Sequence, residues 1–249
     1  MQPTYEPRVE SKLLESAMLM PAYRAVALAV VLLLGLAMPP VGASAKEKKE
    51  KVTLAEFTRR LPARVQDRDS TPGDMLNFVL VGSRSRVEKA LATAGWKQVD
   101  RTKAEAAVRA ILSTMRKKPY TELPMSELFL FGRAQDYGYA RAEPLKVVAA
   151  RHHFRLWKSP WETSSGEEIW LGAGTHDIGF EENRRTGEIT HKIDPEVDKE
   201  RDFIAQTLQD AGQVAGLGYV LPAQPVRQAT TAHGAPFHSD GRVLVIVLK

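Results

Sequence analysis

The sequence of 249 residues contains no cysteine. That absence excludes disulfide frameworks, thiolate zinc sites and cysteine nucleophiles. It also excludes a lipoprotein, because a lipoprotein signal ends at a cysteine that receives the lipid. Any chemistry must therefore use histidine, carboxylates, hydroxyl groups, tyrosine, lysine or the backbone.

The motifs of several large enzyme classes are missing as well. The sequence has no glycine-rich phosphate loop, no Walker sequence, no G-x-S-x-G elbow and no H-E-x-x-H pair, so it lacks the strong signals of nucleotide binding, serine hydrolysis and zinc proteolysis. Its 35 basic and 30 acidic residues are mixed along the chain. Because no basic stripe stands out, a nucleic-acid partner is not expected.

The one long uncharged apolar run, residues 25–38, follows Arg24 near the N-terminus. Two prolines end this run, and a helix of its length spans about 21 Å, short of the roughly 30 Å of a bilayer's hydrocarbon core. Small residues at 43–45 fit a signal cleavage site. We therefore expect a cleaved export signal over residues 1–45.

The export signal predicts a periplasmic or otherwise exported protein. The alternative is an uncleaved N-terminal segment that keeps the chain at the membrane. Residues 1–17 carry mixed charges, unlike the positive start of a signal, which makes Met18 or Met20 an alternative start site. Residues 46–73 are charged and rich in turn formers, so they predict a tether and leave residues 74–249 as a single domain.

Strands outnumber helices in the remaining pattern. Apolar runs and alternation predict strands over residues 75–82, 126–133, 145–157, 167–180, 187–194, 218–222 and 243–248. Helical spacing predicts helices over residues 83–95, 102–118 and 194–212. Ser85 and Glu88 have the spacing of a capping box in the first helix, and Asp194 has the position of a cap in the last. The expected class is α+β, with a mostly antiparallel or mixed sheet, an early helix pair and one late helix.

The stretch ARHHFRLWKSPW, residues 150–161, holds two histidines, two arginines and two tryptophans. Because side chains alternate along a strand, His152 lies on the core face, whereas Arg151, Arg155 and Trp157 share the other. On an open face these arginines and the tryptophan would bind an anionic or polar ligand. The alternative is a face packed by another element and edged with ion pairs.

Two further polar residues follow the end of a predicted strand. Arg133 and Asp136 either present polar groups to the same ligand or lock a turn through an ion pair. The candidate ligand-binding set is therefore Arg133, Asp136, Arg151, Arg155 and Trp157.

Alternation also places His176 and His191 on the core faces of the next two strands. Three converging imidazoles, with His152 as the third, would bind a divalent metal such as zinc and leave a fourth position for water. Each histidine could instead carry protons or be a hydrogen-bonded core residue, and Asp177 could orient one of them. The glycines of Gly172–Gly174 predict a bulge that would turn His176 to the opposite face.

Several ordered motifs carry a resemblance to a known family. They are GDMLNFVLVGS, AGW, PMSELFLFGRAQD, RHHFRLW, EIWLGAGTHDIGF and ITHKIDPEVDKERDFI. From about Leu61 to about Leu221 the sequence resembles the LssY C-terminal domain family. That family is named after a component encoded with a bacterial type I secretion system, and its domain also follows membrane modules of the DedA and phosphatidic-acid-phosphatase kinds. The resemblance implies work at the bacterial envelope but transfers no catalytic residue.

The leading hypothesis is an exported binding or assembly domain at the envelope, without a catalytic motif and without a cofactor. Its expected partner is an envelope protein or an anionic or lipid-like ligand, and association with a membrane surface is expected. The alternative is a metal-assisted or acid–base hydrolase, acting on phosphoesters. In that alternative His152, His176 and His191 would bind the metal or carry protons, and Asp177 would orient one of them.

Overall fold

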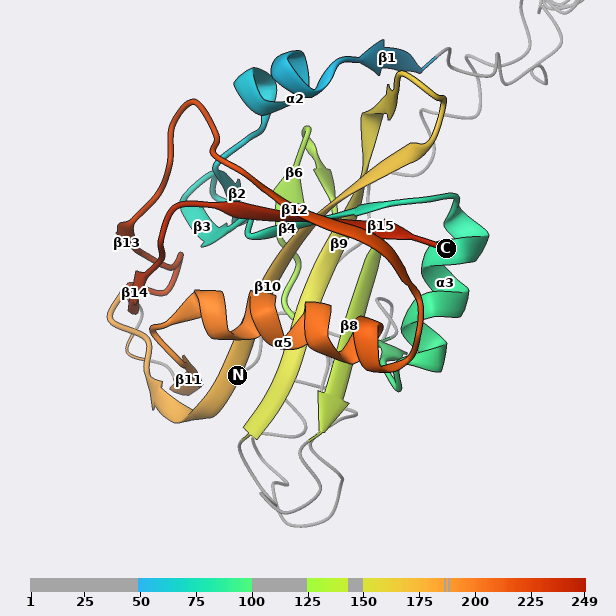
Figure 1. Cartoon of the computed structure of the whole chain (residues 1–249). Coiled ribbons are helices and arrows are strands. Elements are labelled where there is room, and N and C mark those ends of the chain that lie inside the picture. Colours follow the sequence, from blue (N-terminus) through green and yellow to red (C-terminus); the bar gives the residue numbers. More distant parts are fainter. Residues whose placement is uncertain (1–48, 100–124, 143–149, 186, 188) are drawn as a thin grey trace, which may run out of the picture. The chain divides into compact units, whose positions relative to one another are not determined.

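The computed structural model describes residues 49–99, 125–142, 150–185, 187 and 189–249 (Figure 1). The expected signal, residues 1–45, and the second helix of the early pair, residues 102–118, lie outside the described residues. The described part is an α+β fold with a mixed sheet, which confirms the expected class. None of its helices is long and apolar enough to cross a membrane.

Three helices and fifteen strands make up the described part. The helices are α2 (Leu54–Arg60), α3 (Arg84–Thr93) and α5 (Val197–Asp210). The strands are β1 (Glu50–Val52), β2 (Arg64–Gln66), β3 (Pro72–Met75), β4 (Phe78–Val81), β5 (Lys97–Val99), β6 (Phe129–Leu130), β7 (Arg133–Ala134), β8 (Tyr137–Ala142), β9 (Ala150–Thr163), β10 (Glu168–Glu182), β11 (Ile189–Ile193), β12 (Val214–Val220), β13 (Gln228–Thr230), β14 (Pro236–His238) and β15 (Val243–Leu248).

The long hairpin of β9 and β10 is the centre of a large sheet. The strand order is β12-β15-β4-β10-β9-β8-β5, with β1 added to β9 and β11 added to β10. The first part of β10 pairs with β4 and its last part pairs with β11, so one long strand joins two short neighbours. The pairs β15·β4 and β1·β9 are parallel, whereas the other pairs of this sheet are antiparallel.

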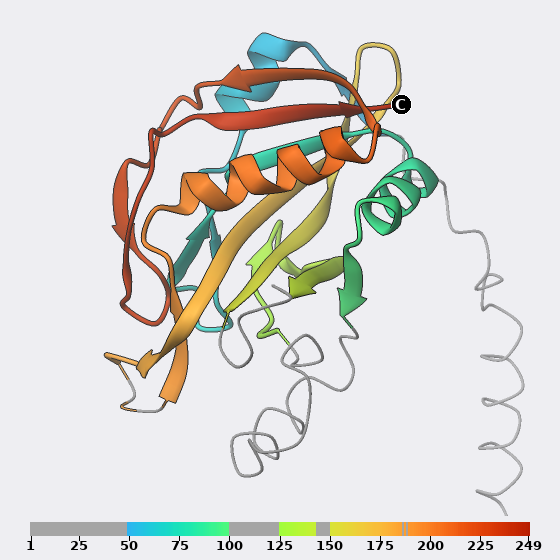
Figure 2. The ribbon, with the colours of Figure 1, turned by 60° about the horizontal axis from the view of Figure 1, so that its bottom comes forward.

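Both faces of the large sheet are covered. On one face α3 and α5 pack over a core that includes Phe154, Leu156 and Trp170 (Figure 2). The other face carries α2 and a second sheet of order β3-β2-β6-β7, which enclose a core that includes Trp157 and Leu171. The central strands are therefore buried on both sides, which explains their continuous apolar runs.

The chain joins the fold earlier than the predicted domain start at residue 74. Val52, Phe57, Leu61 and Val65 are buried in the core beneath α2, and β1 pairs with the end of β9. The expectation of a tether is therefore wrong from Lys49 onward. Its apolar residues are too widely spaced among charges for a run or an alternation to reveal them.

The N-caps of α3 and α5 are not the residues that the sequence predicted. Ser83, not Ser85, is the N-cap of α3, and its hydroxyl accepts a hydrogen bond from the Arg86 backbone N–H. Helix α5 begins at Val197, and the Asp194 carboxylate accepts from the backbone N–H two residues on, before the helix starts. Sequence spacing found α3 and α5 but displaced the N-cap of each by two residues, and it missed α2.

The glycines of β10 do not form the expected bulge. The pairing of β9 with β10 runs without interruption from Trp170 to Ile178. A Cβ at Gly172 would lie 2.2 Å from the Phe78 ring, and a Cβ at Gly174 would lie 2.7 Å from Ile204 Cδ1. Glycine is needed here because neighbouring side chains approach the strand closely.

Candidate functional site

The two faces of β9 were predicted correctly, but the second face is not open. Arg151, Arg155 and Trp157 lie opposite Phe154 and Leu156, as alternation requires. Their exposed fractions are 1%, 4% and 0%. The expectation of an accessible arginine and tryptophan surface is therefore wrong, because the second sheet and neighbouring loops cover this face.

The guanidinium of Arg155 forms hydrogen bonds and an ion pair inside the protein. Its Nε donates to the Ser126 carbonyl at 3.0 Å, and its Nη2 donates to the Ser126 hydroxyl at 3.0 Å. Its Nη1 lies 3.3 Å from the Asp74 carboxylate. Burial lowers the pKa of Arg155, and the carboxylates of Asp74 and Asp177 oppose that shift. This fork joins two segments of the chain and is not presented to a ligand.

Asp177 is the centre of a buried polar cluster on the same face. Its side chain is fully buried, and its Oδ2 lies 3.3 Å from Arg151 Nη2. The same oxygen lies 3.5 Å from His153 Nδ1 and 3.6 Å from His191 Nδ1. We call Arg151, His153, Asp177 and His191 the Asp177 cluster. It consists of one carboxylate, one guanidinium and two imidazoles from β9, β10 and β11.

Both imidazoles of the Asp177 cluster are neutral near pH 7. Burial, followed by the charges of Arg151 and Arg155, lowers the pKa of His153 well below the usual 6.5. The same causes lower the pKa of His191 to about 4. His153 is enclosed, with its Nε2 3.0 Å from the Thr175 hydroxyl, whereas the His191 side chain is 32% exposed. His191 is therefore the member of the cluster that reaches solvent.

The structure brings together two of the three histidines of the proposed metal site. The rings of His152 and His176 stack at 4.2 Å between centroids, and Phe203 stacks on His152 at 3.7 Å. His152 Nδ1 lies 2.6 Å from the Glu200 carboxylate of α5. This arrangement matches the interpretation of His152 as a hydrogen-bonded core residue.

His191 lies with Asp177 and not with the stacked pair. The pairing of β10 with β11 shifts between Asp177 and Gly179, and this bulge sets the face that His191 occupies. The three histidines therefore do not meet as alternation predicted. In the described part of the chain, no group of three or more His, Cys, Asp or Glu residues could hold a metal ion.

Arg133 and Asp136 form the turn-locking ion pair. Arg133 Nη1 donates to Asp136 Oδ1 at 2.8 Å, and Arg133 Nη2 donates to the Lys158 carbonyl at 2.6 Å. Asp136 Oδ2 accepts from the Lys158 backbone N–H at 2.7 Å. Both side chains are partly exposed, but their polar groups hold the β6–β7 hairpin against β9.

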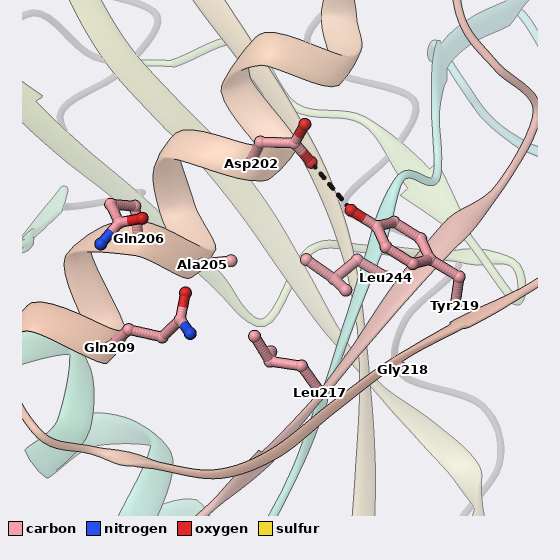
Figure 3. Close-up of a pocket in the computed structure, with 8 residues that line it drawn as sticks. All are labelled: Asp202, Ala205, Gln206, Gln209, Leu217, Gly218, Tyr219 and Leu244. Atoms are coloured by element: carbon pink, nitrogen blue, oxygen red, sulfur yellow. Dashed lines mark hydrogen bonds between the residues drawn. The ribbon is translucent and has the colours of Figure 1, made fainter.

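A pocket that the sequence did not indicate lies between α5 and β12 (Figure 3). Its volume is about 240 Å³. Leu217 and Tyr219 of β12 are 43% and 46% exposed there, and the Tyr219 hydroxyl donates to Asp202 at 3.4 Å. The residues that line it are Asp202, Ala205, Gln206, Gln209, Leu217, Gly218, Tyr219 and Leu244. In the sequence, the segment 214–220 is uncharged and contains two glycines. That is the one feature that could have indicated the pocket.

Comparison with known proteins places the chain in a family. The family model described as LssY C-terminus matches residues 58–243 of the chain. No curated protein and no solved structure matches it. The matched range contains the Asp177 cluster, the stacked histidines and all residues that line the pocket beside β12 except Leu244.

Proposed function

This chain belongs to the LssY C-terminus family, and we propose that it is an exported, envelope-associated binding or assembly domain. Its partner is a protein segment in extended conformation that pairs with the outer edge of β12. The observation that carries this proposal is the combination of an uncharged edge strand with a pocket beside it.

The composition of β12 favours strand addition. It is the last strand at its end of the large sheet as described, and Val214–Val220 contains no charged residue and no proline. Edge strands usually carry lysine, proline or inward charges that prevent pairing with another chain. After an irregularity between Val214 and Gly216, the pairing with β15 is regular up to Val220. A regular, uncharged edge is a suitable template for a partner strand.

The pocket supplies a site for a partner side chain. Leu217 and Tyr219 form its apolar side, and Gln206 and Gln209 of α5 form its polar side (Figure 3). In strand addition the backbone hydrogen bonds give affinity, and pockets for alternate side chains give specificity. A pocket of about 240 Å³ has room for one large side chain.

The buried charges favour a protein partner over an anionic ligand. Arg151 and Arg155 are directed to Asp177, Asp74 and Ser126. An anion in their place would have to break these contacts in a dry interior, which is costly. The pocket beside α5 is instead lined by an aromatic ring, aliphatic side chains, two amides and the carboxylate of Asp202, which suit a peptide better than an anion.

The test is retention of the chain beginning at Lys46 on immobilised envelope proteins. Leu217→Lys places a charge on the edge and is expected to lower retention about tenfold or more. Ile178→Lys is the matched control, because Ile178 and Leu217 are each 43% exposed. Equal retention of the two variants, or no retention of the unmodified chain, would overturn the proposal.

An acid–base hydrolase is the second candidate, and His191 favours it. A partly exposed imidazole whose Nδ1 lies 3.6 Å from a buried carboxylate has the geometry of a general base. In this proposal His191 accepts the proton of an attacking water, and Asp177 stabilises the imidazolium that forms. The substrates to try are phosphate mono- and diesters.

Hydrolysis of p-nitrophenyl phosphate and bis(p-nitrophenyl) phosphate tests this second candidate. His191→Gln is expected to lower the rate about a hundredfold. The exposed His238 provides the control, and His238→Gln is expected to keep the full rate. If the unmodified chain hydrolyses neither ester, or if both variants behave alike, acid–base catalysis at His191 is excluded for these substrates.

A further inference from the structure

An aromatic residue occupies a backbone conformation that suits glycine. Phe131 and Gly132 form the two-residue turn between β6 and β7, with φ values of 54° and 71°. Hairpin turns with positive φ at both positions favour Asn, Asp or Gly at the first of them. A bulky residue with positive φ is strained, and strain of this kind is often retained for function.

The Phe131 side chain extends a partly exposed apolar surface. Phe131 is 39% exposed, and its ring centroid lies 5.6 Å from that of Trp161. Trp161 in turn contacts Phe57 of α2 at 6.1 Å. Leu54, one helical turn before Phe57, is 68% exposed, the highest value among the exposed large hydrophobic residues described. We call Leu54, Phe57, Phe131 and Trp161 the apolar tip; Leu54 and Phe131 are its exposed members, whereas Phe57 and Trp161 are buried. These residues come from α2, the β6–β7 turn and β9, which Figure 1 shows.

The charges around the apolar tip favour an anionic surface. Lys51 and Arg59 are exposed, and Arg59 forms no ion pair among the described residues. Of the nearby carboxylates, Glu50 pairs with Arg60 at 2.7 Å, whereas Glu56 is exposed and, among the described residues, accepts hydrogen bonds only from the capping residue of α2. With three basic and two acidic residues, the segment 50–60 keeps a net positive charge of one. Apolar and aromatic side chains flanked by lysine and arginine match the interface of an anionic bilayer.

The position of the tip in the chain agrees with this partner. The apolar run ends at Met38, 11 residues before Lys49, where the described fold begins. Eleven residues span at most about 40 Å when fully extended. A chain that retains the run in a membrane therefore holds β1 and α2 near that membrane.

We propose that the apolar tip docks on the surface of an anionic lipid bilayer, with Leu54 and Phe131 inserted among the headgroups and Lys51 and Arg59 beside the lipid phosphates. This inference rests on the proposed envelope location. It concerns a different surface from the β12 edge, so either surface can fail its test while the other passes.

The experiment is flotation of the chain beginning at Lys46 with lipid vesicles. The described core lies between Val52 and Leu248, so this chain keeps the core and lacks the apolar run. Vesicles of phosphatidylethanolamine and phosphatidylglycerol are compared with vesicles of phosphatidylcholine alone. The unmodified chain is expected to bind the anionic vesicles, less at high salt, and to bind the phosphatidylcholine vesicles weakly.

Phe131→Gly is the decisive variant, because it removes the ring and gives the turn the residue that it favours. It is expected to lower the vesicle partition coefficient about tenfold while the thermal unfolding midpoint is kept. Leu54→Gln is expected to have a similar effect, and Arg59→Glu is expected to reduce binding to anionic vesicles alone. Ile178→Gln, at a residue of similar exposure, is expected to change nothing.

Two outcomes would overturn the proposal. One is an unmodified chain that floats with neither kind of vesicle. The other is a folded Phe131→Gly or Leu54→Gln variant that binds anionic vesicles as the unmodified chain does. A particular form of the first outcome would identify the partner. If neither the unmodified chain nor Phe131→Gly binds vesicles, and envelope proteins retain only the unmodified chain, the apolar tip contacts a protein. The lipid proposal is then wrong.

Discussion

At the scale of single residues, Asp177 supplies the negative charge of the buried Asp177 cluster. It is the carboxylate that faces the guanidinium of Arg151 and the imidazoles of His153 and His191. Asp177 on β10 lies directly opposite Arg151 on β9, and both side chains are buried. Breaking a buried ion pair by removing one partner is strongly destabilising, because the remaining charge loses its compensation.

We therefore expect Asp177→Asn to lower the free energy of unfolding by about 3 kcal/mol or more. Asp69→Asn is the control, because Asp69 is exposed in a turn, and its effect is expected to stay below about 1 kcal/mol. Urea denaturation followed by circular dichroism measures both. An Asp177→Asn variant as stable as the control would mean that the carboxylate does not compensate the buried cations.

The second residue-scale prediction concerns pH. The pKa of His191 is about 4 in the folded chain and near 6.5 when unfolded. Between these values the unfolded chain binds more protons than the folded chain, so this histidine makes stability fall as the pH drops from about 6.5 to about 4. His153, whose pKa is also lowered, acts in the same direction.

His191→Gln is expected to reduce that loss of stability between pH 6.5 and pH 4. The measurement is the urea midpoint across this range, compared with that of the unmodified chain. Carboxylates titrate in both proteins, so the difference between the two curves isolates His191. His238→Gln, at an exposed histidine, is expected to follow the unmodified curve; a similar flattening in both variants would contradict the assignment to His191.

At the scale of elements, the sequence predicted the central strands and the two faces of β9. The run at 243–248 became β15 with the same bounds, because an uninterrupted apolar run of strand length has few other solutions. The sequence did not predict that the side chains of Arg151 and Arg155 are buried. A polar face on a strand looks exposed, and the residues that cover it come from 64–75 and 129–134, far away in the sequence.

Contacts with residues distant in the sequence also explain why the bulge expected at the β10 glycines was wrong. A glycine in a strand indicates either a bulge or a close approach of another group, and only the position of Phe78 decides between them. Because a Cβ at Gly172 would lie 2.2 Å from that fully buried ring, the ring would have to move within a packed core. Nothing lies within 4 Å of a Cβ at Gly179, in the same strand.

Gly172→Ala is therefore expected to lower the free energy of unfolding by about 2 to 3 kcal/mol. Gly179→Ala is the control in the same strand and is expected to change it by less than about 1 kcal/mol. Equilibrium denaturation in urea distinguishes the two. A neutral Gly172→Ala would mean that the ring moves freely, and the glycine would then need another explanation.

At the scale of the whole molecule, the start of the domain was the main error. Residues 46–73 look like a tether because charges and turn residues separate their few apolar side chains. Those side chains nevertheless enter the core, and Phe57 covers Trp161. The family match begins at residue 58, inside α2, so it does not mark the start of the fold either. Among the described residues, the first side chain buried in the core is that of Val52.

The last prediction follows from this boundary. A chain beginning at Leu61 lacks β1, α2 and the buried side chains of Val52 and Phe57. It is expected to lose about 3 kcal/mol or more of stability relative to a chain beginning at Lys46, because each buried apolar side chain contributes about 1.5 to 3 kcal/mol. Its tryptophan fluorescence is expected to shift to longer wavelength as Trp161 becomes exposed. Equal stability and equal emission in the two chains would instead restore the interpretation of this segment as a tether.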